Sequence, residues 1–210
     1  MAASRYETRD LTQLPIEALQ PGEVVLNAEQ IQNRVNELAE EIAETYRDQK
    51  LILVGLLKGA DVFMVHMMEA LYKAGFTNFE TEYMQVKTRD NQLESSGKID
   101  IIKDIPPEKL INKNVLLVDD IADSLTTFVG VAEHFQPYGL TSFRTLSLLE
   151  KPSRHRPELR GFPLDFVGFK IPDVWVEGYG LDSFEYGRGN PDIVKGPTPG
   201  ALAFKAAQQK

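Results

Sequence analysis

Two apolar runs that do not alternate constrain the fold of this chain most strongly. Residues 51–57 read Leu-Ile-Leu-Val-Gly-Leu-Leu, and residues 115–118 read Val-Leu-Leu-Val. Strands that are buried on both faces of a parallel sheet have this composition, whereas half-exposed strands alternate. A helical pattern follows each run, over residues 61–74 and about 125–135. This succession predicts an α/β fold with an open, mostly parallel twisted sheet flanked by helices.

Weaker patterns predict the other elements. Asn27, with Gln30 three residues later, is typical of a helix start, and apolar residues at spacings of three and four carry that helix to about Asp48. Further strands that complete the sheet are expected at residues 79–86, 141–149, 165–169 and 174–177. No repeat, linker or shift in composition appears. We therefore expect a single domain over residues 1–210, with an N-terminal extension (1–23) and a loosely held tail (197–210).

Composition excludes several classes of function. The 210 residues include 31 acidic and 23 basic side chains, a net charge of −8, and no cysteine. Disulfides, thiolate metal sites and cysteine nucleophiles are therefore excluded, and a reducing compartment is expected. The negative charge argues against nucleic acid and anionic membranes as partners. Neither a signal peptide nor a membrane-spanning run is apparent, so a soluble cytoplasmic protein is expected.

The most informative segment directly follows the second apolar run. It reads Asp-Asp-Ile-Ala-Asp-Ser-Leu-Thr-Thr over residues 119–127 and leads into a predicted helix. In open parallel sheets, ligands bind beyond the carboxyl ends of the strands. The helix N-terminus can hold a phosphate, whereas the acids need hydroxyl groups or a divalent cation such as Mg²⁺ as partners.

Three interpretations of residues 119–127 compete. An ordinary helix start explains one acid better than three. A phosphorelay receiver domain also ends a strand in two acids, but its acidic pair lies near the N-terminus, and Gly168 stands where the receiver pattern has its phosphoacceptor aspartate. The third is the phosphoribosyltransferase motif, in which an apolar strand precedes two acids, two apolar residues, Asp, Ser or Thr, two further residues and Thr. Every defined position of that motif is filled.

On these residues the chain resembles the hypoxanthine-guanine phosphoribosyltransferases, which are purine-salvage enzymes, from about residue 24 to residue 193. Other matching stretches are Leu-Lys-Gly-Ala (57–60), Glu-Lys-Pro (150–152), residues 165–173, and residues 175–182 with Arg188 six positions on. The resemblance implies the type I phosphoribosyltransferase fold, with a small hood region from the N- and C-terminal segments. It also implies transfer of ribose 5-phosphate from 5-phospho-α-D-ribose 1-diphosphate (PRPP) to a 6-oxopurine, through an oxocarbenium-like transition state.

The resemblance also implies roles at the PRPP end of a site. Asp119 and Asp120 would meet the ribose hydroxyls and metal-bound diphosphate, with Asp182 as a further Mg²⁺ ligand. The 5-phosphate would lie on residues 123–127, namely Asp123, Ser124, Leu125, Thr126 and Thr127. The pyrophosphate would meet Lys58, Gly59 and Arg188, and the bond between Leu57 and Lys58 is expected to be cis.

At the purine end, Asp123 would exchange a proton with purine N7, although the same residue suits a helix N-cap. Lys151 would donate to the oxygen at purine carbon 6, and Val176 and Asp182 would lie at the purine edge. Trp175, the only tryptophan, would stack on the base. Packing in the hydrophobic core is the alternative interpretation, because a lone tryptophan is usually a core residue.

Two departures from the family pattern affect these expectations. Thr88 and Arg89 stand in the expected mobile loop (87–98), where the family usually has Ser-Tyr. Glu177 replaces a residue that is usually apolar in the family. Its carboxylate would either accept a hydrogen bond from the guanine amino group or disfavour the xanthine carbonyl. Alternatively, the side chain faces away from the base, because neighbours along a strand alternate sides. A xanthine-preferring enzyme and a non-catalytic PRPP- or nucleotide-binding regulator therefore stay open as alternatives. A homodimer or homotetramer is expected from the resemblance alone.

Overall fold

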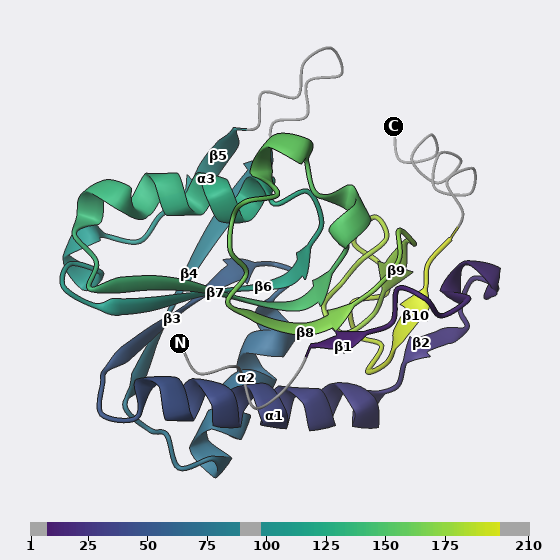
Figure 1. Ribbon diagram of the computed structural model, residues 1–210, viewed down its shortest axis with the longest axis horizontal. Coiled ribbons are helices and arrows are strands. Elements are labelled where there is room, and N and C mark those ends of the chain that lie inside the picture. The colour runs from purple at the N-terminus through teal and green to yellow at the C-terminus, as the bar shows by residue number, and fades with distance from the viewer. Residues whose placement is uncertain (1–7, 89–97, 198–210) are drawn as a thin grey trace.

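The structure is a computed structural model that describes residues 8–88 and 98–197. Its main sheet has seven strands in the order β1-β8-β7-β6-β3-β4-β5 (Figure 1). Their bounds are β1 Arg9–Asp10, β3 Leu51–Leu57, β4 Phe79–Thr88, β5 Ile99–Lys103, β6 Asn114–Ala122, β7 Ser142–Glu150 and β8 Phe166–Lys170. The β4–β5 pair is antiparallel, and every other neighbouring pair in this described sheet is parallel. The predicted open, mostly parallel sheet is confirmed.

Helices cover both faces of this sheet. Helices α1 (Ala28–Tyr46) and α2 (Asp61–Lys73) lie on one face, and α3 (Thr126–Phe135) lies on the other (Figure 1). Along β3, Leu51 and Leu53 pack into the core with α1 and α2, whereas Ile52 and Val54 pack into the core with α3. All four side chains are buried. The two-sided burial explains why the run does not alternate, and each such side chain contributes about 1.5–3 kcal/mol.

Helix α1 begins as predicted. The Asn27 side chain accepts a hydrogen bond from Gln30 N at 2.9 Å, and the Gln30 side chain accepts from Asn27 N at 2.9 Å. This reciprocal capping box satisfies two backbone donors that a helix start leaves unpaired.

Arg34 of α1 is a buried charge that joins this helix to the sheet. Its Nε donates to Gly168 O at 3.0 Å, and Nη2 donates to Val167 O at 2.9 Å. Its Nη1 pairs with Glu37 at 2.9 Å. These hydrogen bonds fix α1 against β8, the strand that carries only the two-residue strand β1 on its outer side.

A second sheet forms from segments far apart in the sequence. Strands β2 (Val24–Leu26), β10 (Ile193–Lys195) and β9 (Val176–Glu177) pair antiparallel in that order. They form the hood expected from the N- and C-terminal segments, beside the β8 end of the main sheet (Figure 1). The expectation that residues 174–177 complete the main sheet is wrong, because β9 pairs with β10 instead.

Other differences from expectation concern element ends and short elements. Strand β4 continues through Thr88, so the loop predicted over residues 87–98 begins later; Arg89 and residues 90–97 lie outside the described residues, as does nearly all of the expected tail. Strands β1, β2, β5 and β10 were not anticipated. Short 3-10 helices occur at Ile16–Ala18, Pro107–Lys109, Gln136–Tyr138, Pro152–Arg154 and Pro157–Leu159. None of the helices in the described ranges has the length and apolarity to cross a membrane.

Candidate active site

The acidic pair lies at the end of the central strand β6. Asp119 pairs in register with Ser147 of β7, and Asp120 N donates to Asp119 Oδ1 at 3.0 Å. Asp119 is half-buried, and Asp120 is buried. Burial, and next the charge of Asp120, raise the pKa of Asp119 well above its usual value. Burial also raises the pKa of Asp120. Adjacent carboxyl groups with raised pKa values ionise more readily when a partner stabilises their negative charge. Hydroxyl donors and cations are partners of this kind.

The turn after β3 packs directly against this pair. A Cβ atom at Gly59 would overlap Asp120 Oδ2, so only glycine permits the approach. The peptide bond between Leu57 and Lys58 is cis, as the resemblance implied. Gly180, with φ of 96°, packs in turn on the carbonyl of Gly59. Three segments from distant parts of the chain therefore meet at one edge of the sheet.

The segment between β6 and α3 has the form of an anion cradle. Leu125 has φ of 67° and is the N-cap of α3, with its side chain buried. Thr126 N and the Ser124 hydroxyl lie 3.3 Å apart, and the Ser124 hydroxyl donates to Thr126 Oγ1 at 3.0 Å. The amides of the first helical turn have no partner earlier in the helix, so they are available to an anion. Helix α3 begins at Thr126, and the suggestion that Asp123 is its N-cap is wrong.

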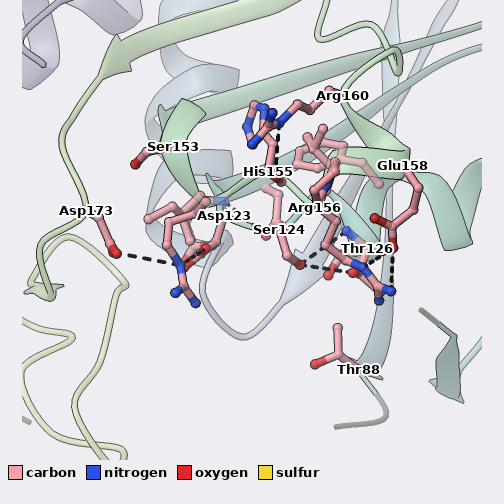
Figure 2. Close-up of a pocket in the computed structure, with 18 of the residues that line it drawn as sticks. Thr88, Asp123, Ser124, Thr126, Ser153, His155, Arg156, Glu158, Arg160 and Asp173 are labelled. Atoms are coloured by element: carbon pink, nitrogen blue, oxygen red, sulfur yellow. Dashed lines mark hydrogen bonds and ion pairs between the residues drawn. The ribbon is translucent and has the colours of Figure 1, made fainter. Parts of the chain in front are cut away.

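A cavity of about 1170 Å³ opens in front of this cradle. Asp119, Asp123, Thr127 and Thr88 line it, and its opposite wall is the segment 153–160, which we call the basic turn. Figure 2 shows His155, Arg156 and Arg160 of that turn around the cavity, and Arg154 lines it as well. The backbone of Arg156 donates to Ser124 O at 3.3 Å, which ties the basic turn to the cradle. Sequence reasoning assigned no role to this turn; three arginines and a histidine within seven positions were the available signal.

Asp123 stands between two cations rather than capping a helix. Its Oδ1 accepts from Arg154 Nε at 3.0 Å, and its Oδ2 lies 3.6 Å from Lys151 Nζ. Arg154 Nε also lies 3.8 Å from Asp173 Oδ1. The hydrogen bond to Asp123 raises the pKa of Arg154. The carboxylate therefore has a defined orientation and projects into the cavity.

A smaller cavity of about 190 Å³ adjoins Asp123 on the hood side. Lys151, which directly follows β7, is buried and lines this cavity together with Trp175, Val176 and Asp182. Trp175 is 47% exposed, so core packing does not explain it. A flat apolar ring and a buried ammonium group are thus brought to one small cavity, as expected for a heteroaromatic base with an exocyclic oxygen.

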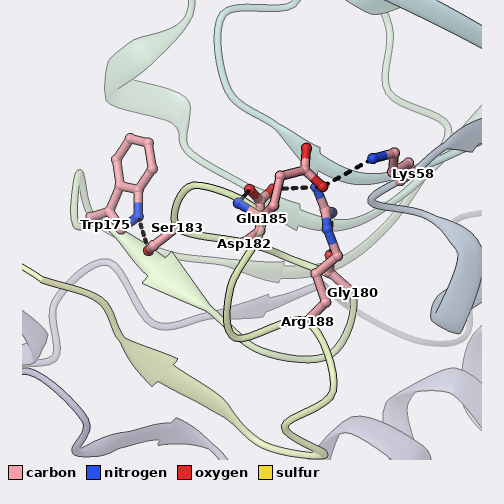
Figure 3. A network of polar contacts seen from close by, with 7 residues as sticks. All are labelled: Lys58, Trp175, Gly180, Asp182, Ser183, Glu185 and Arg188. Carbon is pink, nitrogen blue, oxygen red and sulfur yellow. Dashed lines mark hydrogen bonds and ion pairs between the residues drawn. The ribbon is translucent and has the colours of Figure 1, made fainter. Parts of the chain in front are cut away.

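The residues predicted to bind pyrophosphate, Lys58 and Arg188, belong to a network of charged side chains with Asp182 and Glu185 (Figure 3). Arg188 pairs with Asp182 at 2.7 Å and donates to Gly180 O at 2.7 Å. Glu185 joins the two predicted pyrophosphate ligands, lying 3.0 Å from Lys58 Nζ and 3.5 Å from Arg188 Nη2. The hydrogen bond from Lys58 lowers the pKa of Glu185. Sequence reasoning missed Glu185, because nothing local indicates that it meets Lys58.

The predicted residues within the described ranges all lie at this edge of the sheet. Asp119, Asp120, Asp123 and Asp182 line one cavity, and Gly59 contacts Asp120. Glu177 is different: its side chain lies against Gly187 and is absent from the described lining of the smaller cavity, which favours the expectation that it faces away from a base.

The acidic residues suit a shared Mg²⁺ better than a cation held by protein alone. Within residues 8–88 and 98–197, no three His, Asp or Glu side chains lie close enough together to hold a metal. Mg²⁺ usually takes one or two carboxylates and fills its octahedron with water and substrate phosphates. Asp119 and Asp120, or Asp182 once it leaves Arg188, provide carboxylates of this kind at the cavity wall.

Comparisons with known proteins agree with this geometry. The family model for the phosphoribosyl transferase domain matches residues 23–184. The hypoxanthine-guanine phosphoribosyltransferase of Aquifex aeolicus is 37% identical over 171 residues, covering 81% of this chain and 92% of the relative. The protein of that name from Staphylococcus aureus strain Mu50 is 35% identical over 171 residues, covering 81% of this chain and 91% of the relative.

Solved structures give the same result. A hypoxanthine phosphoribosyl transferase of Trypanosoma cruzi superposes with a TM-score of 0.80 at 28% identity, covering 89% of this chain and 96% of that chain. A hypoxanthine phosphoribosyltransferase of Staphylococcus aureus superposes with a TM-score of 0.76 at 34% identity, covering 84% of this chain and 92% of that chain.

Proposed function

The chain belongs to the phosphoribosyltransferase family, and from that premise we propose that it converts PRPP and hypoxanthine or guanine to IMP or GMP and diphosphate. The observation that carries the proposal is the meeting of three strand-end segments: Asp120 packs on Gly59, Gly59 on Gly180, and the 119–127 segment opens into the same cavity. A ribose linked to phosphates at both ends needs this kind of three-part site. The relatives named above support the choice of 6-oxopurines as acceptors.

The 5-phosphate binds the cradle at Ser124 to Thr127, where amides and hydroxyls converge at the start of α3. The backbone of Leu125 contributes, since its side chain is buried. The ribose then lies over Asp119 and Asp120, whose carboxylates accept hydrogen bonds from its two hydroxyls. Lys58, the amide of Gly59, and Arg188 receive the pyrophosphate after Glu185 releases the two cations.

The purine occupies the smaller cavity. Trp175 stacks on its face, Lys151 donates to the oxygen at carbon 6, and the backbone of Val176 together with Asp182 meets its edge. Asp123 lies between the two cavities and holds or accepts the N7 proton. Fixing both reactants at adjacent sites supplies the orientation that a bond exchange at the anomeric carbon requires.

Charge at the departing diphosphate is the main electrostatic demand of this reaction. The oxocarbenium-like ribose is stabilised by Asp119 and Asp120, and the leaving diphosphate by Lys58, the amide of Gly59 and Arg188. Asp119, Asp120 or Asp182 would hold Mg²⁺, which would supply further positive charge to the diphosphate. The Mg²⁺ requirement of this chain is part of the proposal.

Two further properties belong to the proposal. We expect a homodimer or homotetramer; the Trypanosoma cruzi structure comes from a study of how the C-terminal region affects that protein's oligomeric state and enzymatic activity. The cytoplasmic location expected from the cysteine-free sequence also stays a prediction. Nucleic acid and membranes are not expected partners.

Nucleotide synthesis tests the proposal directly. The protein is incubated with Mg²⁺, PRPP and one base at a time, and absorbance changes report nucleotide formation. Product with hypoxanthine or guanine supports the proposal. A clear preference for xanthine would replace it with the xanthine-specific alternative. Binding of PRPP without product from any 6-oxopurine would favour the non-catalytic regulator.

A further inference from the structure

Trp175 presents its indole to the base cavity from an exposed position. The residue is 47% exposed and directly precedes β9. An indole in that position has several staggered rotamers open to it, and only some of them leave the ring face parallel to a base in the cavity. The side chain is nevertheless anchored, because its Nε1 donates to the hydroxyl of Ser183 at 2.8 Å (Figure 3).

Ser183 is suited to be a fixed anchor. It is fully buried, at 0% exposure, and therefore cannot follow a moving ring. Its backbone N–H and C=O are both paired with Tyr186, since Ser183 N donates to Tyr186 O at 3.0 Å and Tyr186 N donates to Ser183 O at 3.2 Å. Its hydroxyl accepts from the indole, which satisfies a polar group that burial would otherwise penalise.

Gly196 packs against the same edge of the ring, at the carbon next to Nε1. A Cβ atom at this position would overlap Trp175 Cδ1, so the chain passes the five-membered ring at a distance that only glycine permits. Gly196 N also donates to Trp175 O at 2.8 Å. The ring is therefore confined by a hydrogen bond from one segment and by direct backbone contact with another.

We propose that Ser183 and Gly196 are positioning residues that hold the plane of Trp175 ready to stack on a flat heteroaromatic base. The identity of the base as a 6-oxopurine rests on the proposed function, whereas the confinement of the indole does not. A ring that is already oriented loses less conformational entropy when the base binds. The contribution therefore appears in base binding and leaves the chemistry at PRPP unchanged.

Steady-state kinetics of Ser183→Ala test the expected contribution to base binding. The KM for the purine should rise about 2- to 10-fold, which corresponds to one ordinary hydrogen bond. The KM for PRPP and kcat should stay within about 2-fold. Trp175→Phe keeps an aromatic face but lacks the donor, so adding Ser183→Ala to Trp175→Phe should raise the purine KM no further. An equal rise in both backgrounds would contradict the proposal, since Ser183 would then act without the indole.

Fluorescence of the free protein tests the confinement separately. Because Trp175 is the only tryptophan, its emission maximum and its quenching by acrylamide report this ring alone. Ser183→Ala and, independently, Gly196→Ala should each shift the emission and increase quenching. Ser142→Ala is the matched control. Ser142 begins β7, at the end of that strand away from Lys151, and its hydroxyl donates to Asn114 of β6, so the emission of this variant should match the wild type.

The two parts of the test fail in different ways. If the wild-type protein makes no nucleotide from any base, the proposed function fails, and the fluorescence comparison still decides whether Ser183 and Gly196 hold the ring. If both variants fold, as judged by circular dichroism, and their emission and quenching equal those of the wild type, the indole is not confined by these residues and the inference is wrong.

Discussion

At the scale of single residues, Asp123 has the most specific surroundings in the site. Arg154 Nε lies 3.0 Å from one carboxylate oxygen and Lys151 Nζ 3.6 Å from the other. Asp123→Asn keeps the shape but cannot exchange the purine proton, so turnover should fall by about 10²–10⁴. Near-normal turnover would show that Asp123 only pairs with its neighbours. Asp173→Asn, on the other side of Arg154, is the control for lost charge and should change turnover by less than about 5-fold.

Arg154 itself leads to a second prediction. It orients Asp123 but lies outside the smaller cavity, in the basic turn. Arg154→Ala should lower kcat by about 5- to 50-fold through loss of this orientation. Arg160→Ala, also in the basic turn, is the matched control, because the Nε of Arg160 donates to a backbone carbonyl. Equal losses in both variants would mean that the basic turn acts through its total charge.

Gly59 provides the sharpest steric prediction. A methyl group there would overlap Asp120 Oδ2, so Gly59→Ala should displace the carboxylate and raise the KM for PRPP at least about 10-fold. Gly161→Ala is the control, since no heavy atom lies within 4 Å of an added Cβ there. An unchanged KM for PRPP in Gly59→Ala would remove Asp120 from the ribose site.

The residues that could be predicted from sequence are those that one local motif aligns. Asp119 to Thr127 run from the carboxyl end of strand β6 into the first turn of helix α3, so their shared position follows from local structure. Arg154 contacts an acid 31 residues away, and Glu185 contacts a lysine 127 residues away. No local pattern indicates such partners, and both contacts therefore became known only from the fold.

At the scale of elements, the same distinction separates the long strands from the short ones. Strands β3 and β6 were predictable because their residues are buried on both faces. Strands β1, β2 and β10 have only two or three residues, too few for a pattern, and they exist because distant partners pair with them. The hood was expected from resemblance alone.

Arg34 provides the test at this scale. Arg34→Met removes two hydrogen bonds that join α1 to β8, which leaves two strand carbonyls without this donor, and it also removes the ion pair with Glu37 within α1. The free energy of unfolding should fall by about 2–4 kcal/mol, measured by urea denaturation. Arg47→Met, at the exposed C-terminal end of the same helix, should change it by less than about 0.5 kcal/mol. Equal small effects would mean that Arg34 contributes little to the docking of α1.

At the scale of the whole molecule, the net charge of −8 and a polyanionic substrate are compatible. Four acids lie at the site, where hydroxyl groups and Mg²⁺ are their expected partners, and under the proposed function backbone amides, Lys58 and Arg188 would bind the phosphates. Net charge governs long-range attraction to extended polyanions, whereas a small ligand responds to the local groups that contact it.

The buried acidic pair makes stability depend on pH. The pKa of Asp119 is raised in the folded protein, so from about pH 4 upward the unfolded chain releases this proton before the folded protein does. The free energy of unfolding therefore decreases as pH rises through that interval. Asp119→Asn removes the unfavourable free energy of ionising Asp119 in the folded protein. It should therefore raise Tm at pH 7–8 in EDTA by about 2–4 °C for each kcal/mol removed, and the difference in Tm between variant and wild type should vanish near pH 4. An identical Tm of variant and wild type at neutral pH would show that ionising Asp119 does not destabilise the folded protein.

The central claim is a transfer of ribose 5-phosphate that requires both substrates. Phosphorus NMR of PRPP with the protein, Mg²⁺ and hypoxanthine follows the diphosphate and the nucleotide phosphate in one sample. The account predicts that both appear together in equal amounts, and that PRPP stays intact when the base is omitted. Release of diphosphate at the same rate without a base, or persistence of PRPP in the complete mixture, would contradict it.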